Sequence, residues 1–214
     1  MRVFFHYCLF GFSNCYILGT DHDDKPGDDE TPELREAIII DPGCMDEQIL
    51  NFIEKNDYSL RGILVTHDHA NHVHGIKTLK KIYNVDIYGI NHIVADFKTR
   101  IVRDGDVLNI GPFKIQVISV PGHSSDSAVY KIENLLFTGD ALTAGLVGTT
   151  PSSYGAAIQV TALRSKILSL PGDLAILPGH GPPSSLETER RFNIGINLYE
   201  QTKNHRKQFQ NDFL

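Results

Sequence analysis

Apolar residues along this chain fall mostly in short runs that are closed by glycine, proline, aspartate or asparagine. Runs of this length and setting predict buried strands. Two pairs of runs are predicted to form hairpins, 1–10 with 14–18 and 127–132 with 135–138. Single strands are expected at 37–40, 62–65, 85–89, 113–120 and 172–177.

Between these runs lie segments whose apolar positions recur at helical spacing. These segments are 46–56, 76–83, 91–97 and 157–170. Ser184 followed three residues later by Glu187 forms a capping box, which predicts one more helix. Each half of the chain therefore carries strands and then helices. This order predicts an α/β fold with two sheets packed face to face and helices outside, an αββα sandwich.

The strand at 62–65 leads into Thr66-His67-Asp68-His69-Ala70-Asn71-His72-Val73-His74-Gly75, which holds four of the ten histidines. A lone loop histidine is usually solvated, but packing gives no reason for a cluster, and imidazole is the commonest metal ligand near neutral pH. His67 and His69 are two apart in an extended segment, so they point the same way and can share one metal ion. His72 follows one turn later. Open α/β sheets bind their ligands at such carboxyl ends of strands.

Three further strand ends carry a ligand-type residue beside a glycine. They are Pro121-Gly122-His123, Thr138-Gly139-Asp140 and Pro178-Gly179-His180. If the four ends meet at one edge, they form a site of imidazoles and a carboxylate. That donor set suits zinc, iron or manganese.

The motifs His-x-His-x-x-His, Pro-Gly-His-Ser, Phe-Thr-Gly-Asp and Leu-Pro-Gly-His-Gly-Pro, in this order, resemble the metallo-β-lactamase superfamily and its short glyoxalase II-like hydrolases. The resemblance implies a four-layer αββα catalytic domain at 1–193, followed by a helical tail at 194–214. It implies a first metal site of His67, His69, His123 and Asp140, with Asp140 bridging to a second site that contains His72 and His180. It assigns catalysis to Asp140, Asn71 and His72.

Asn71 departs from the family pattern, which has a metal-ligating aspartate at this position. An amide oxygen is neutral and a poorer ligand than a carboxylate. The first site is therefore expected to be intact and the second is in doubt. Whether one or two ions bind stays open.

Five other polar residues near these motifs receive separate expectations. Asp41, in an Asp-Pro-Gly turn, is expected to be structural, and His92 is also left structural. Asp126 is expected to be a surface turn residue, with a role behind the ligands as the alternative. Asp68 stays open between orienting a ligand and simple exposure. His74 is expected to be a surface histidine at a helix start.

Composition and charge exclude several classes of protein. The chain is 41% hydrophobic and 21% charged, as in ordinary globular proteins. Its formal net charge of -6 is accounted for by segment 20–36, expected to be a solvated acidic loop. The remainder shows no basic patch, so no nucleic-acid partner is expected. No apolar run approaches the ~20 residues of a membrane span, and His6 interrupts the start, so a signal peptide is not expected.

The three cysteines, Cys8, Cys15 and Cys44, show no Cys-x-x-Cys spacing. Cys8 and Cys15 are expected to be buried thiols in strands. Without a sign of export, a reducing cytoplasm is the expected location.

A metal held by such donors lowers the pKa of bound water towards ~7, so no protein nucleophile is needed. The chain has no Gly-x-Ser-x-Gly elbow to supply one. The resemblance implies hydrolysis of a small-molecule thioester such as S-lactoylglutathione. Only about thirty residues follow Pro183, so the glutathione-gripping domain of larger glyoxalase II enzymes is expected to be reduced or absent. The alternatives are a mononuclear-iron persulfide dioxygenase and a metal-binding protein with decayed catalysis. The oligomeric state stays open.

Overall fold

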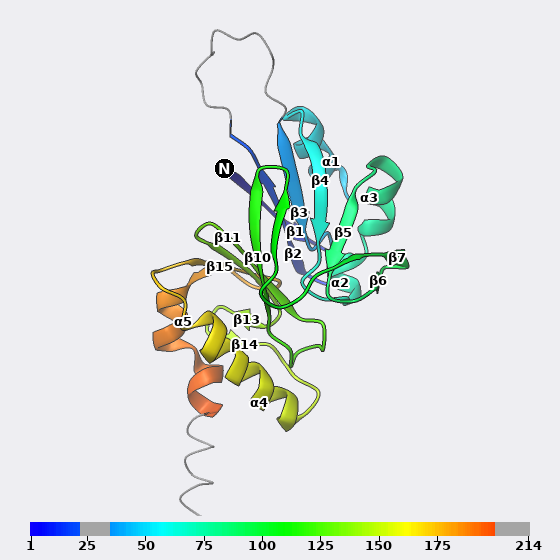
Figure 1. The fold of residues 1–214 in the computed structure, drawn as a ribbon. Helices are drawn as coiled ribbons and strands as arrows, with labels where there is room; N and C mark the ends of the chain where they lie inside the picture. Colours follow the sequence, from blue (N-terminus) through cyan, green and yellow to red (C-terminus); the bar gives the residue numbers. More distant parts are fainter. Residues whose placement is uncertain (22–34, 200–214) are drawn as a thin grey trace, which may run out of the picture.

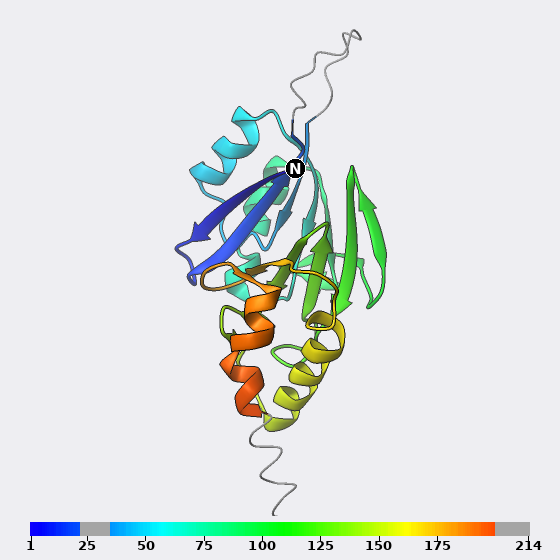
Figure 2. The ribbon, with the colours of Figure 1, turned by 90° about the vertical axis from the view of Figure 1, so that its left-hand side faces the viewer.

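The fold consists of two six-stranded sheets that face each other. The computed structural model describes residues 1–21 and 35–199. Helices lie outside both sheets, one group at each side of the molecule (Figure 1, Figure 2). The predicted αββα fold class is confirmed.

The first sheet has the order β1-β2-β3-β4-β5-β8. Its strands are β1 (Arg2–Cys8), β2 (Ser13–Gly19), β3 (Glu36–Ile40), β4 (Ser59–Leu64), β5 (Asp86–Gly89) and β8 (Arg100–Ile101). β1 and β2 form the predicted antiparallel hairpin, and β3, β4, β5 and β8 run parallel.

The second sheet has the order β16-β15-β12-β11-β10-β9. Its strands are β9 (Val107–Ile110), β10 (Phe113–Ser119), β11 (Ala128–Ile132), β12 (Leu135–Gly139), β15 (Ala175–Pro178) and β16 (Ser184–Ser185). The predicted hairpin of β11 and β12 is present. Two antiparallel steps make β10 run the same way as β12, and β15 is parallel to β12. The carboxyl ends of these three strands therefore meet at one edge of the sheet.

The helices and small hairpins fill the outer layers and the connections. They are α1 (Glu47–Lys55), α2 (Ala70–Val73), α3 (Ile76–Ile82), α4 (Ser153–Ala162), a π-helical turn (Leu163–Ile167) and α5 (Leu186–Phe192), with the hairpins β6 (Ile93–Val94) with β7 (Phe97–Lys98) and β13 (Leu142–Thr143) with β14 (Leu146–Val147).

Side chains that alternate between the two faces of a strand let β3 contribute to two apolar cores. Ile38 and Ile40 of β3 face the second sheet, whereas Ile39 faces the helices α1 and α3. All three are at most 1% exposed. Because side chains alternate across a strand, a strand buried on both faces is apolar throughout. This burial anchors the strand ends that carry the site.

The short helix predicted at 91–97 is wrong, because this segment forms the β6–β7 hairpin. Ala95 and Asp96 have φ values of 49° and 70°, which are the two left-handed positions of a tight hairpin turn. Seven residues with few apolar positions do not separate a helical period from a hairpin.

Three boundaries also differ from those predicted. The helix predicted at 157–170 begins at Ser153, because the Ser152 side chain accepts from the backbone N–H of Gly155 and caps it, and it ends with the π turn at Ile167. The cap of α5 is Ser185, which accepts from the N–H of Thr188, so the predicted Ser184 capping box is wrong. The last predicted strand begins at Ala175 rather than at residue 172.

Two predicted segments lie largely outside the described residues. Of the acidic loop at 20–36, only its ends are described, and of the tail at 194–214, only 194–199, which is helical. Among the described residues, no helix is long and apolar enough to cross a membrane.

Candidate metal centre

Six side chains of ligand-forming type reach one place from four strand ends. They are His67, His69 and His72 after β4, His123 after β10, Asp140 after β12 and His180 after β15. The shared direction of β10, β12 and β15 and the facing end of β4 explain this convergence. The structure therefore brings together all six residues predicted to bind metal.

The first group consists of His67, His69 and His123. The Nε2 atom of His67 lies 3.0 Å from Nδ1 of His69, which lies 3.1 Å from Nε2 of His123. The His67 side chain is 1% exposed, whereas His69 is exposed. The three nitrogens thus converge at a point that is buried on one side and open on the other.

The second group consists of His72 and His180. The carboxylate of Asp140 lies close to both groups. Its Oδ2 atom is 3.6 Å from Nε2 of His123, 3.9 Å from Nε2 of His67 and 3.5 Å from Nε2 of His180. Its Oδ1 atom is 3.5 Å from Nε2 of His72. One carboxylate therefore faces both groups, as a bridging ligand requires.

In four of the imidazoles, the nitrogen turned away from the cluster meets an oxygen atom. These Nδ1 contacts join His67 to Thr66 Oγ1 (3.1 Å), His72 to Asp41 Oδ2 (3.1 Å), His123 to the carbonyl of Thr149 (2.8 Å) and His180 to the carbonyl of Phe12 (2.8 Å). A carbonyl oxygen only accepts, so Nδ1 donates in the last two, and their Nε2 lone pairs point into the cluster. Such partners fix the tautomer that a metal ligand needs.

Asp41 supports the site from behind and is not one of the converging ligands. Its Oδ1 accepts from the N–H of Thr66 at 2.7 Å, and its Oδ2 accepts from the Thr66 hydroxyl at 2.6 Å and faces His72. Asp41 has φ 49° and is 2% exposed. Its expected structural role agrees with this position, and that role is to orient His72.

Replacing Asp41 by asparagine is expected to lower metal affinity about 10–100-fold. Asparagine tolerates the positive φ, and its oxygen can still accept from the N–H of Thr66. Its NH₂ group then faces Nδ1 of His72, which favours the tautomer with the proton on Nε2, the atom turned towards Asp140.

Competition with a coloured chelator measures this effect. Asp86→Asn is the matched control, because Asp86 forms only an exposed ion pair with Arg100. Equal affinities for Asp41→Asn and Asp86→Asn would show that Asp41 does not orient His72.

Asn71 lies beside the second group, where the family pattern has aspartate. Its Nδ2 atom is 2.8 Å from Nε2 of His180, and its backbone carbonyl accepts from the Ser13 hydroxyl at 2.5 Å. The side chain thus aims an N–H donor at the nitrogen that would ligate a second ion. A second cation there therefore requires the amide to turn its oxygen inward.

Gly179 keeps the second group open. A Cβ atom at this position would lie 2.5 Å from Oδ1 of Asp140 and 2.5 Å from Cε1 of His72. Real Cβ contacts are not this short, so any side chain would displace both groups. The glycine before His180 is therefore required by the close approach of β15 to the ligands.

Burial and neighbouring charges shift the pKa values of three residues in the cluster. Burial and the neighbouring His72 lower the pKa of His67 to about 3. Burial also acts to lower the pKa of His72, but the carboxylates of Asp140 and Asp41 outweigh it and raise that pKa to about 9. Burial acts to raise the pKa of Asp140, but His72, His180 and His67 hold it at about 2. A cation among these donors would take the place of the proton that the raised pKa of His72 favours.

Two buried atoms of the cluster, Nε2 of His72 and Oδ1 of Asp140, have no hydrogen-bond partner. Buried polar atoms without partners are costly, and each one calls for an explanation. The two atoms lie 3.5 Å from each other. The donor set of imidazole nitrogens and carboxylate oxygens fits zinc or iron, so the residues fit a metal centre.

The remaining polar residues divide between support and surface. Asp126 is 7% exposed and accepts from the N–H of Asp68 at 2.9 Å and from the side chain of Asn91 at 2.8 Å. The expectation of a surface turn residue is wrong for Asp126, because it buttresses the histidine loop. No local signal marked this long-range contact. Asp68 and His74 are exposed, and His74 stacks on Phe10 with ring centroids 4.3 Å apart.

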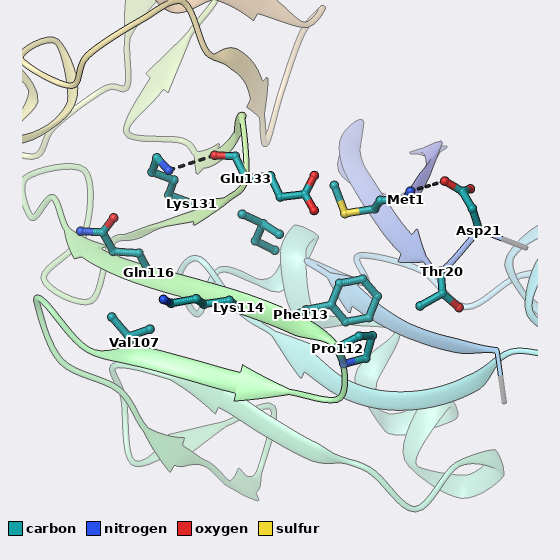
Figure 3. Close-up of a pocket in the computed structure, with 11 residues that line it drawn as sticks. Met1, Thr20, Asp21, Val107, Pro112, Phe113, Lys114, Gln116, Lys131 and Glu133 are labelled. Atoms are coloured by element: carbon teal, nitrogen blue, oxygen red, sulfur yellow. Dashed lines mark hydrogen bonds and ion pairs between the residues drawn. The ribbon is translucent and has the colours of Figure 1, made fainter. Parts of the chain in front are cut away.

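A cavity of about 820 Å³ opens at the opposite end of the sandwich, where β2 ends and β10 begins (Figure 3). Figure 3 shows Phe113, Lys114 and Lys131 around it, with Met1 and Asp21 paired at its rim. None of its lining residues is a histidine or a cysteine. It is therefore separate from the metal-binding cluster.

Comparisons with known proteins agree with the motifs. The model of the Metallo-beta-lactamase superfamily matches residues 32–180. The chain is 29% identical over 187 residues to hydroxyacylglutathione hydrolase GloC of Haemophilus influenzae, covering 76% of this chain and 88% of that protein.

Two solved structures give the same picture. ETHE1 from Myxococcus xanthus has a TM-score of 0.75 at 26% identity, covering 91% of this chain and 84% of that one. TTHA1623 in a di-iron-bound form has a TM-score of 0.71 at 25% identity, covering 89% and 98%. The superfamily consists mostly of hydrolases that use divalent metals. The chain thus belongs to the metallo-beta-lactamase superfamily.

Proposed function

We propose that this protein is a metal-dependent hydrolase of a thioester of the S-lactoylglutathione type. The observation that carries the proposal is the gathering of five imidazoles around Asp140, those of His67, His69, His72, His123 and His180. The likeness to a hydroxyacylglutathione hydrolase supports the substrate class.

When bound, the metal supplies a water activated near neutral pH and a Lewis acid for the carbonyl oxygen. The chain's own residues hold the donors in place. Asp41 and the Thr149 and Phe12 carbonyls orient the imidazoles. The Thr66 hydroxyl, beside His67, is buried and donates to Asp41, so it is committed to positioning and is not a free nucleophile.

The tip of the β1–β2 hairpin provides an apolar wall for the substrate. Phe12 is 64% exposed, and its backbone carbonyl accepts from Nδ1 of His180, so this tip of the hairpin adjoins the site. Leu9 and Phe10 of the same tip are 78% and 48% exposed. This surface suits the apolar parts of an acyl thioester.

A persulfide dioxygenase that uses a single iron is the second candidate. The N–H donor that Asn71 turns towards His180 favours a one-metal centre, and the likeness to ETHE1 fits this candidate. In that case the first group and Asp140 would hold the single ion.

The deciding experiment is metal analysis of protein purified without a chelator or a nickel column, followed by two assays. Thiol release from S-lactoylglutathione, absent in Asp140→Ala, is the expected result. Oxygen consumption with glutathione persulfide, without thioester cleavage and with one iron per active site, would replace the first candidate by the second. Inactivity in both assays with metal bound would favour a binding protein with decayed catalysis.

A further inference from the structure

A second cluster of metal-binding side chains lies on the outer side of the first sheet. His6 and Cys8 are two residues apart on β1, so their side chains share one face of the strand, and both are buried. Cys44 comes from the turn after β3. One donor atom from each of the three lies within 4.8 Å of the others. Asp46, the N-cap of α1, adjoins them. None of these residues belongs to the centre around Asp140.

The distances join the four side chains into one group. The Sγ atoms of Cys8 and Cys44 are 2.9 Å apart, and Sγ of Cys44 lies 3.7 Å from Oδ2 of Asp46. The same Oδ2 lies 2.8 Å from Nε2 of His6. Asp46 uses its other oxygen, Oδ1, to cap the N–H groups of Gln48 and Ile49, so Oδ2 faces His6 and Cys44 while Oδ1 holds the helix.

We infer that His6, Cys8, Cys44 and Asp46 form a structural site for zinc, with two thiolates, one imidazole and one carboxylate as ligands. This inference does not depend on the proposed function. Four protein ligands, here from two separate segments (β1 and the turn before α1), are typical of closed structural zinc sites.

Zinc–ligand bonds of about 2.0–2.3 Å place tetrahedral ligand atoms roughly 3.3–3.8 Å apart. The contact between Cys44 and Asp46 already has this length, and the two shorter contacts widen by less than about 1 Å around an ion. The Asp46 side chain is 44% exposed and Cys44 is only partly buried, so both can make this adjustment. Cys8 and His6 are fixed by the strand.

A disulfide between Cys8 and Cys44 is the competing explanation of the short sulfur contact. It would use two of the four groups and give no reason for the imidazole and carboxylate beside them. A cation accounts for all four, because each offers an atom that zinc accepts.

The site would brace the turn that supports the catalytic cluster. Residues 41–46 run from Asp41, which orients His72, to the first turn of α1. The carbonyl of Pro42 accepts from the N–H of Gly75, and a Cβ on Gly75 would lie 2.3 Å from the Cys44 carbonyl oxygen. An ion held by all four residues would therefore tie the far end of this turn to β1, while the Pro42 carbonyl contacts the histidine loop.

Cobalt titration of the full chain, kept reduced with a phosphine, tests the inference. Thiolate ligands give cobalt an intense near-ultraviolet charge-transfer band, which imidazole and carboxylate ligands do not give. The cluster around Asp140 contains no cysteine. The band therefore reports only on the proposed site of His6, Cys8, Cys44 and Asp46. We expect the band in the wild type, its displacement by zinc and its loss in Cys8→Ser/Cys44→Ser.

The single variant Cys44→Ser changes a partly exposed loop residue. Its zinc affinity at this site is expected to fall more than about a hundredfold, because loss of a direct ligand costs more than loss of a hydrogen-bond partner behind a ligand. Cys15→Ala is expected to retain the band, because the Cys15 thiol contacts Cys8 but is not one of the four ligands; loss of the band in this variant would make Cys15 a ligand and overturn the proposed set. Absence of the band in reduced wild-type protein would overturn the inference, and so would a band that survives in the double variant. If thiol titration before reduction finds one free thiol instead of three, and the reduced protein gives no band, Cys8 and Cys44 form a disulfide and not a zinc site.

Discussion

Asp140→Ala and His67→Ala are expected to abolish metal-dependent turnover without unfolding the protein. Asp140 faces four imidazoles at 3.5–3.9 Å, so its removal takes a ligand from both groups. Loss of a group that only hydrogen-bonds to a metal ligand costs about 10–100-fold in metal affinity or activity. Loss of a direct ligand should therefore cost more than about a hundredfold.

The fold should survive because the sandwich buries its apolar faces without help from the ligands. The core between the sheets contains Tyr16, Leu64 and Phe137, and Asp140 and His67 belong to none of the apolar clusters. Ile39→Ala, by contrast, truncates a fully buried side chain and should cost roughly 2–5 kcal/mol of unfolding free energy. It serves as the reference for a true folding defect.

Three measurements on the same preparations separate the effects: metal content, turnover and thermal unfolding by circular dichroism. Asp104→Ala is the control for Asp140→Ala, since Asp104 lies outside the site and pairs with Lys166 at 2.8 Å. A ligand variant that retains wild-type turnover would remove Asp140 or His67 from the site. A variant that unfolds like Ile39→Ala would show that the ligands hold the fold.

The core strands were predictable from sequence because each is a short apolar run between turn residues, and burial on both faces leaves little ambiguity. The six ligand candidates were predictable for a related reason. His123, Asp140 and His180 follow strands of one sheet whose carboxyl ends share an edge, and His67 follows β4 of the facing sheet. Their roles as metal ligands remain predictions that the experiments above test.

What sequence reasoning missed depends on contacts between distant segments or on fine local geometry. Asp126 buttresses Asp68 across 58 positions, and a turn-like sequence gives no sign of that. Cys8 and Cys44 meet only because β1 and the turn after β3 share one face of a sheet. Ser184 and Ser185 are equally good caps by type, and tertiary contacts decide between them: Ser184 bonds to Glu189 at 2.5 Å, which leaves Ser185 to cap α5.

Asn71→Asp is expected to raise occupancy of the second metal position and to increase hydrolysis. In the wild type, the amide presents an N–H to Nε2 of His180 at 2.8 Å. Aspartate has almost the same shape but presents only oxygen atoms, and it adds a charge that favours a cation. His72, His180 and Asp140 are already placed around this position, so one oxygen ligand completes the set.

Asn71→Ala separates the two parts of this change, because it removes the N–H donor without adding a carboxylate. If alanine raises occupancy as much as aspartate does, the amide was only blocking the position. If aspartate alone raises it, the missing ligand was the limit. Adding His180→Ala to Asn71→Asp should then return the stoichiometry to that of the wild type, since the gained ion needs both residues. An unchanged metal count in Asn71→Asp would mean that Asn71 already serves as a ligand through its oxygen, and that this one departure from the family pattern does not weaken the second site.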